Sequence, residues 1–176
     1  MGEMAAVKID QIDLRILSVL QHDGRISNLK LAEKVGLSPS PCLHRVKRLE
    51  AARLIRRYGA QLDANRVLRH IFAYVEITLE KHRAEDFAQF ERFVLDTPEI
   101  ITCALISGDF DYIVQFVAAD LSHFHKLMDR ILQAKISIAR HFTYVVIKKV
   151  KDTWELPLQH LCEADRQLTS ELASLR

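Results

Sequence analysis

The sequence has 176 residues, 49% of them hydrophobic and 27% charged, which is typical of a soluble globular protein with one or two small domains. Its apolar runs fall short of the roughly 18 residues that a membrane span needs, and residues 1–10 lack the apolar stretch of a secretory signal. Three widely spaced cysteines do not predict a disulfide framework. We therefore expect a cytoplasmic protein without a membrane partner.

Charge is divided unevenly along the chain. Residues 1–69 carry 13 Lys and Arg against 7 Asp and Glu, whereas residues 70–176 carry 12 against 16. A basic half suggests a domain that binds a polyanion, but clustered charge on a solvated surface explains the same pattern, and charge alone does not separate the two. Within residues 42–58 a single acid stands against six cations, which are Arg45, Lys47, Arg48, Arg53, Arg56 and Arg57.

Three short helices are expected in the first half of the chain. Apolar residues at three- and four-residue spacing predict helices over about residues 9–23, 28–35 and 40–52. The Ser27 hydroxyl can cap the second helix, and Gly36 can take the left-handed conformation that ends it. Residues 54–62 alternate imperfectly and predict either a strand pair or a hinge.

From residue 71 the hydrophobic period changes to that of strands. The expected order is strand, helix, strand, strand, helix and strand over residues 71–79, 84–95, 100–106, 110–118, 120–132 and 138–150. This βαββαβ order predicts a ferredoxin-like domain, so the fold class is α+β. We expect a winged-type helix-turn-helix domain over residues 8–62, a hinge over 63–70, a second domain over 71–152 and a partly helical tail over 153–176.

A helix-turn-helix places its last helix in the major groove of DNA, with the first residues of that helix near the base edges. Leu49 is expected to face inward. Arg45 and Arg48 are the predicted base readers, because arginine pairs bidentately with guanine. His44 is consistent with a DNA contact or with an ordinary surface histidine. The candidate DNA-contacting residues are Ser38, Ser40, Pro41, His44, Arg45, Lys47, Arg48, Arg53, Arg56 and Arg57.

Five motifs stand out along the chain, which are DGRISN at residues 23–28, VGLSPSPCL at 35–43, FAYVEITL at 72–79, SGDFDY at 107–112 and TYVV at 143–146. In combination they resemble the Lrp/AsnC family of leucine-responsive and related regulators. The resemblance runs from about residue 9 to residue 150. It implies a nucleoid-associated transcriptional regulator that binds double-stranded DNA, forms dimers and larger assemblies such as tetramers or octamers, and responds to an amino acid. Its expected targets are genes of amino-acid metabolism or transport, and its second domain is then the sensing and oligomerising one.

The SGDFDY turn suggests an effector site. Gly108 allows close backbone approach, consecutive backbone N–H groups can hold a carboxylate, and Asp109 or Asp111 can accept from an ammonium group. The alternative is a plain hairpin turn whose aspartates bond to their own backbone. The family resemblance favours the effector site. Its candidate residues are Leu105, Gly108, Asp109, Asp111, Tyr112, Thr143 and Tyr144, with Ile106 and Phe142 as further apolar neighbours.

One departure from the family pattern lies before the last strand, where Ile136 and Ser137 replace the usual Pro-Gly turn, so leucine is not assumed as the effector. The tail after residue 150 is expected to dock on the domain surface or on a neighbouring subunit. Metal-ligand spacings, activated nucleophiles and nucleotide-binding glycine motifs do not occur, so we expect no metal, no cofactor and no enzymatic activity. The alternative function is a small-molecule-binding or enzymatic ferredoxin-like protein whose N-terminal helices contact another protein.

Overall fold

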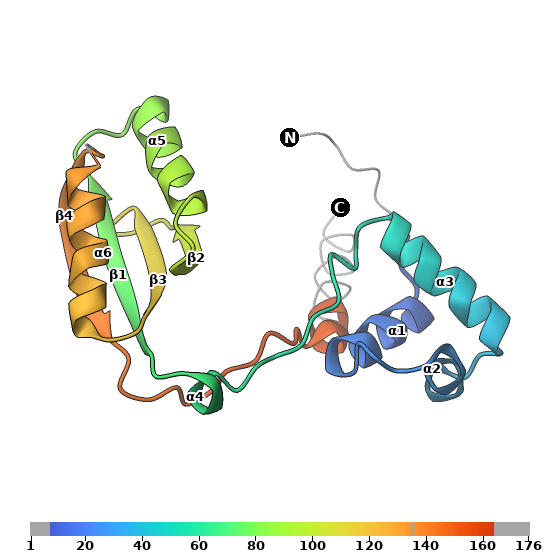
Figure 1. Cartoon of the computed structure of the whole chain (residues 1–176). Coiled ribbons are helices and arrows are strands. Elements are labelled where there is room, and N and C mark those ends of the chain that lie inside the picture. The colour runs from blue at the N-terminus through green and yellow to red at the C-terminus, as the bar shows by residue number, and fades with distance from the viewer. Residues whose placement is uncertain (1–7, 135, 164–176) are drawn as a thin grey trace. The chain divides into compact units, whose positions relative to one another are not determined.

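The computed structural model describes residues 8–134 and 136–163, which divide into two compact units (Figure 1). The first unit comprises residues 8–61 and 152–163 of this described chain, and the second comprises residues 62–151. The chain therefore passes from the first unit to the second and then returns. No helix within the described residues is long and apolar enough to cross a membrane.

The first unit contains the three predicted helices, α1 (Gln11–His22), α2 (Asn28–Val35) and α3 (Pro39–Ala51). Both helix-boundary predictions are confirmed. The Ser27 hydroxyl accepts from the Lys30 N–H at 3.4 Å at the start of α2, and Gly36 ends that helix at φ 75°. Residues 54–63 form no strand, so of the two interpretations of this stretch the strand pair is wrong.

A small apolar cluster holds the three helices of the first unit together. Cys42 and Leu49 from α3 are completely buried against Ile16 of α1. Leu43, by contrast, is 43% exposed, because it lies on a different side of α3 from the core. Cys42 is therefore a packing residue, and burial raises the pKa of its thiol.

The second unit is a four-stranded antiparallel sheet with strand order β2-β3-β1-β4. This order, together with the βαββαβ sequence of elements, confirms the predicted ferredoxin-like architecture. A short helix not foreseen from the sequence, α4 (Ala64–Val67), precedes the sheet. The other elements are β1 (Ile71–Leu79), α5 (Ala84–Leu95), β2 (Ile100–Leu105), β3 (Tyr112–Ala118), α6 (Leu121–Gln133) and β4 (Ile138–Val145).

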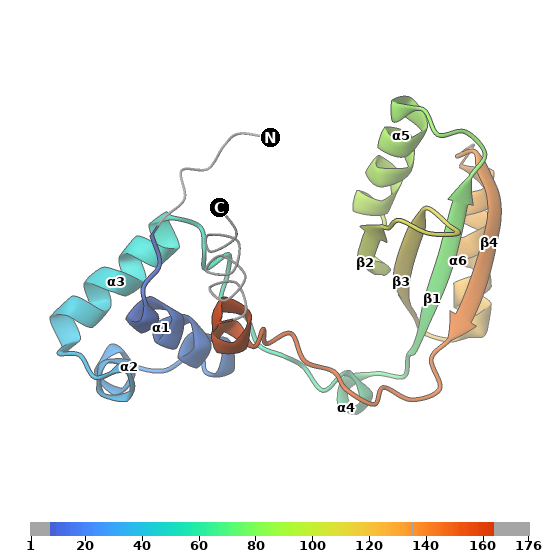
Figure 2. The ribbon, with the colours of Figure 1, turned by 180° about the vertical axis from the view of Figure 1, so that it is seen from behind.

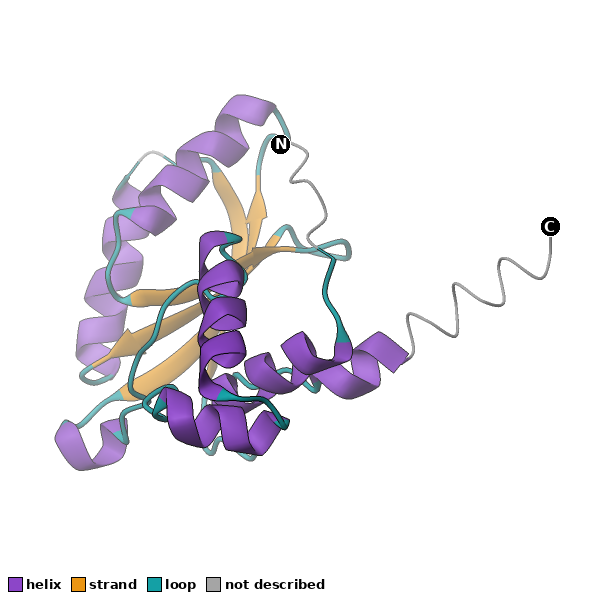
Figure 3. Cartoon of the chain, turned by 90° about the vertical axis from the view of Figure 1, so that its right-hand side faces the viewer, coloured by secondary structure: helices purple, strands orange, loops and turns teal. Residues whose placement is uncertain are grey.

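Helices α5 and α6 cover one face of this sheet, and Figures 2 and 3 show the strands beside them. Residues of β1 alternate strictly, with Ala73, Val75 and Ile77 buried on the helix side. Phe90 of α5 and Phe124 of α6 pack onto that side. The opposite face of the sheet carries the intervening residues of each strand and has no helix over it within the second unit.

The last strand is shorter than the predicted range of residues 138–150, because β4 ends at Val145. Its partner strand explains this difference. β4 pairs with β1 alone, and β1 begins at Ile71, so only the bond from the Val146 N–H to the Phe72 carbonyl at 2.8 Å continues the ladder. Residues 147–163, the described part of the chain after Val146, form no strand.

The end of α3 is unusual, because Arg53 lies in the left-handed region at φ 56°. Among the described residues it is the only one other than glycine with a positive φ. The conformation lets the Leu54 N–H reach the Leu49 carbonyl at 3.0 Å, which closes the helix. A residue with a Cβ pays roughly 1–2 kcal/mol for this conformation, which glycine avoids.

We therefore predict that Arg53→Gly raises the free energy of unfolding of the first unit by about 0.5–1 kcal/mol, the strain relieved minus the extra flexibility of the unfolded glycine. The measurement is urea unfolding followed by fluorescence of Trp154, the single tryptophan, which belongs to the first unit. Arg53→Ala removes the same charge but keeps the Cβ, and should leave stability unchanged. Equal stabilisation by both variants would contradict the prediction.

Candidate nucleic-acid interface and effector site

The exposed side of α3 carries a short polar row. Cys42 and Leu49 fix one side of the helix in the core, and the side about 180° away carries Ser40, His44 and Lys47 at helical spacing. All three are exposed. We call Ser40, His44 and Lys47 the α3 crest, which is the part of the helix best placed to enter a groove.

Arg45 and Arg48, the two predicted base readers, lie on the flank of α3 between the crest and the core. The Arg45 guanidinium donates to Asp10 at 2.6 Å and to Asp13 at 2.9 Å, and Arg48 also donates to Asp13. Hydrogen bonds from Arg45 to Asp10 and then Asp13 raise the pKa of the guanidinium. The pKa of Asp10 is lowered, first by the Asp13 N–H and then by Arg45. Sequence reasoning missed both acids, because their spacing is equally that of an ordinary helix cap.

The start of α3 offers few backbone donors to an anion. Pro39 and Pro41 have no N–H, and the Cys42 N–H is bonded to the Ser38 carbonyl at 3.2 Å, which leaves the Ser40 N–H. The Ser38 hydroxyl makes no capping bond, although Ser38 is the N-cap residue. Contacts at this end of the helix therefore depend on side chains.

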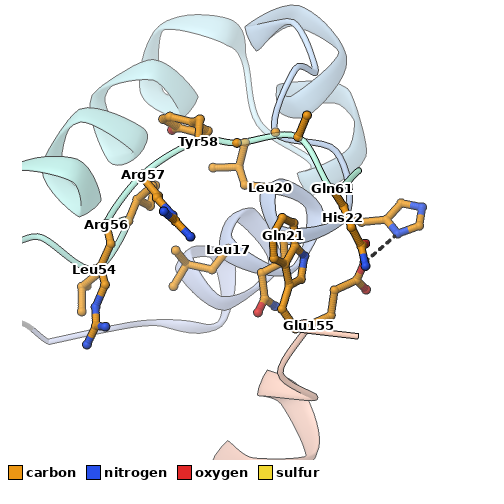
Figure 4. Close-up of a pocket in the computed structure, with 15 residues that line it drawn as sticks. Leu17, Leu20, Gln21, His22, Leu54, Arg56, Arg57, Tyr58, Gln61 and Glu155 are labelled. Atoms are coloured by element: carbon orange, nitrogen blue, oxygen red, sulfur yellow. Dashed lines mark hydrogen bonds and ion pairs between the residues drawn. The ribbon is translucent and has the colours of Figure 1, made fainter. Parts of the chain in front are cut away.

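Three further predicted cations follow α3 and are all exposed: Arg53, Arg56 and Arg57. Arg56 and Arg57 line an open groove of about 950 Å³ in the first unit, to which α1 contributes Leu17 and Leu20 (Figure 4). Exposed cations beside a helix-turn-helix are suited to phosphates, which position a protein on DNA without reading sequence.

The returning tail closes one side of this groove. The Gln21 side chain donates to the Leu156 carbonyl at 3.2 Å and accepts from the Leu156 N–H at 2.9 Å. Next to it, His22 Nδ1 lies 3.3 Å from the Glu155 carboxylate, the dashed line of Figure 4. The tail therefore docks on the first unit of its own chain. The predicted helical part includes residues 158–163, and its remainder lies outside the described residues.

The SGDFDY turn is braced from within the second unit. The Asp111 carboxylate accepts from the Leu79 N–H at 2.7 Å and lies 3.0 Å from His82 Nε2. This bond joins the turn to the end of β1, 32 residues away, and is not a bond within the turn's own backbone. Asp109 is exposed, and its carbonyl accepts from Arg140 at 3.1 Å. Gly108 does not take a positive φ, so its freedom is not used there.

The remaining candidate effector residues lie in different environments and do not form one site. Tyr112 is buried, and its hydroxyl donates to Glu91 at 2.9 Å. Thr143 faces the helix side and lines a cleft of about 300 Å³ beside α6, whereas Tyr144 faces the open side, because consecutive strand residues point to opposite faces. Leu105 is exposed at the end of β2.

The departure before β4 has a structural role. Ile136 is buried in the core of the second unit, and the Ser137 carbonyl accepts from the Glu80 N–H at 2.8 Å. Ile136 thus adds an apolar side chain to the core, whereas the bond at residue 137 uses the backbone and does not depend on the side chain.

Both units match known families. Residues 9–56 match the family described as winged helix-turn-helix DNA-binding, and residues 72–156 match the Lrp/AsnC ligand binding domain. The transcriptional regulatory protein DoeX of Halomonas elongata is 45% identical over 145 residues, which are 82% of this chain and 92% of that protein. The leucine-responsive regulatory protein of Escherichia coli is 41% identical over 151 residues, 86% of this chain and 92% of that protein.

Solved structures agree with these sequence matches. The regulator NMB0573 of Neisseria meningitidis, in complex with L-Met, superposes with a TM-score of 0.81 at 34% identity, covering 88% of this chain and 99% of that one. An AsnC family regulator from Agrobacterium tumefaciens gives the same score and identity, covering 86% and 99%. The helix-turn-helix, the ferredoxin-like sheet and these relatives together show that the chain belongs to the Lrp/AsnC family of DNA-binding transcriptional regulators.

Proposed function

We propose that this regulator reads DNA sequence with the α3 crest, acts as a dimer or larger assembly, and responds to an amino acid. The observation that carries the proposal is the two-sided character of α3, with core residues on one side and Ser40, His44 and Lys47 on the other. Its role is regulation at the nucleoid, rather than catalysis, at genes of amino-acid metabolism or transport.

DNA contacts divide into two classes under this proposal. The crest, with Pro41 and Ser38 at the start of the helix, meets base edges or nearby phosphates. Arg53, Arg56 and Arg57 contact phosphates. Arg45 and Arg48 are not proposed as base readers, since their guanidinium groups already pair with Asp10 and Asp13 at the start of α1.

Self-association is proposed to use the open face of the sheet. This face carries exposed aromatic side chains, with Tyr74 37%, Phe142 50% and Tyr144 51% exposed. Tyr74 and Tyr144 are direct cross-strand partners, so they form a continuous apolar patch across β1 and β4. A patch of this kind, on a sheet face that no described helix of the second unit covers, is suited to a second copy of the same sheet.

The amino-acid effector is proposed from the relatives and from the SGDFDY turn. One relative is named leucine-responsive, and a solved neighbour holds L-Met. In this chain the exposed Asp109 is the better candidate for an ammonium group, because the Asp111 carboxylate already accepts from Leu79. An effector acts by preferring one assembly or one arrangement of the DNA-binding units.

Lys47→Ala should weaken discrimination between a duplex selected from a random library and a scrambled duplex of equal length by about 1–3 kcal/mol, the range for one base contact. Fluorescence anisotropy at fixed KCl concentration measures both affinities. Lys126→Ala removes an exposed cation on α6 and serves as the matched control. Unchanged discrimination in Lys47→Ala would refute the base-reading role of the crest.

Tyr144→Asp should weaken self-association by about tenfold or more, because association would bury a carboxylate in an apolar patch. Sedimentation equilibrium gives the association constant. His141→Asp introduces the same charge on the same strand but on its helix-facing side, and should associate normally. Loss of association in both variants would point to the β4 edge instead of the open face.

Amino acids that bind should raise the melting temperature of the native protein, since a ligand of the folded state stabilises it. Of the twenty amino acids tested at millimolar concentration, we expect at least one to raise the melting temperature clearly. Asp109→Asn should weaken the apparent affinity for that amino acid about tenfold, as expected for a lost charged contact. Asp96→Asn at the end of α5 is the control. An unchanged response in Asp109→Asn would remove Asp109 from the site.

A further inference from the structure

A completely buried carboxylate lies between α1 and the flank of α3. Asp13 has no exposed surface, and its two oxygens accept from Arg45, from Arg48 and from the Asp10 N–H at 3.1 Å. Asp10 belongs to the same cluster, since its carboxylate accepts from the Asp13 N–H at 2.8 Å and from Arg45. Asp10 at the N-cap of α1, Asp13 within α1, and Arg45 and Arg48 of α3 thus form one ionic network.

The two arginines differ in how much of each remains available. The Arg45 side chain is 28% exposed, and its Nη1 atom is shared between both carboxylates. The Arg48 side chain is 48% exposed, and one of its amino groups is held by Asp13. Arg45 is therefore committed to the network, whereas Arg48 keeps a solvent-facing part.

We infer that Asp10 and Asp13 are positioning residues for sequence reading, which hold Arg45, and one end of Arg48, off the DNA. The inference rests on the proposed reading of DNA by the α3 crest and adds the reason why the crest, and not the arginine flank, faces the bases. In this arrangement Ser40, His44 and Lys47 carry sequence discrimination, and Arg45 contributes no base contact.

The burial of Asp13 is what makes the restraint effective. If Arg45 and Arg48 turned to DNA, a carboxylate without exposed surface would lose both of its cationic partners. Such a group is strongly unfavourable, because low-dielectric surroundings do not replace the lost charge or hydrogen bonds. A phosphate competes poorly for Arg45, because it must give up hydrating water to bind, whereas the Asp13 carboxylate is already buried beside the guanidinium.

The network also bears on non-specific binding. A free arginine near the groove contacts phosphate on any sequence and adds affinity that carries no sequence information. By neutralising Arg45 internally, Asp10 and Asp13 remove one such contact. Loss of either acid should therefore raise affinity for unrelated DNA more than affinity for the preferred site, which lowers the ratio of the two.

Asp13→Asn in the full-length protein tests this inference, with Asp10→Asn as a second variant that keeps a good helix cap. The probes are the library-selected duplex and its scrambled counterpart, titrated with KCl. We expect affinity for the scrambled duplex to rise about five- to tenfold near 0.1 M salt, and the slope of log affinity against log salt to steepen by about one contact. Asp10→Asn should show a smaller change in the same direction, because Asp13 still holds Arg45.

Glu33→Gln is the matched control, because it removes an exposed acid on α2 that belongs to the same unit but not to the network. It should change both affinities equally. Asp13→Asn/Arg45→Ala should lose the added affinity for scrambled DNA, and Arg45→Ala alone should leave discrimination within about twofold of the original. Trp154 fluorescence checks that each variant is folded.

Two results would overturn the inference. One is a tenfold loss of discrimination in folded Arg45→Ala, which would make Arg45 a direct base reader. The other is that Asp10→Asn and Asp13→Asn behave as Glu33→Gln does. Failure of the crest proposal is recognised separately, by unchanged discrimination in Lys47→Ala.

Discussion

The geometry of the DNA-binding unit depends on one buried charge. Among residues 8–134 and 136–163, Asp13 is the only charged residue that is buried, and both of its cationic partners come from α3. A buried ion pair is a weak source of net stability but a strict geometric constraint, because any rearrangement that separates the charges is costly. Cys42 and Leu49 hold α3 by apolar contact, which tolerates small rotations, whereas Asp13 fixes how the helix is turned about its own axis.

In the second unit the corresponding constraint is the central strand. β1 pairs with both β3 and β4, so its alternation decides which side of each neighbour faces the helices. Asp111 then fixes the end of that strand through the Leu79 N–H. The SGDFDY turn is thus joined directly to the strand on which the whole sheet depends. A ligand that moved this turn would act on the centre of the sheet rather than on a loose loop.

Local patterns predicted the elements well, because each depends on nearby residues. The bounds of β1 and α5 agree with the alternation and helical spacing of the sequence, and Ser27 and Gly36 mark helix ends as their chemistry requires. The candidate site was harder to predict. Basic charge at Arg45 indicated DNA contact, but its pairing with Asp13 joins residues 32 positions apart and leaves no periodic signal. Thr143 and Tyr144 are a different case, because strand alternation is a local signal and already places two adjacent residues on opposite faces.

The chain joins the two units at two places, between residues 61 and 62 and between residues 151 and 152. Both segments leave the sheet at the same end, where the Val146 N–H bonds to the Phe72 carbonyl across β4 and β1. The returning segment is then held on α1 by Gln21. A change in the pairing of β1 with β4 would therefore act where both connections start, and the returning one is fixed to the DNA-binding unit ten residues later, at Leu156. An effector can use this route only to the extent that it binds one arrangement more tightly than another, so the coupling is set by that difference in affinity and not by the tightness of binding itself.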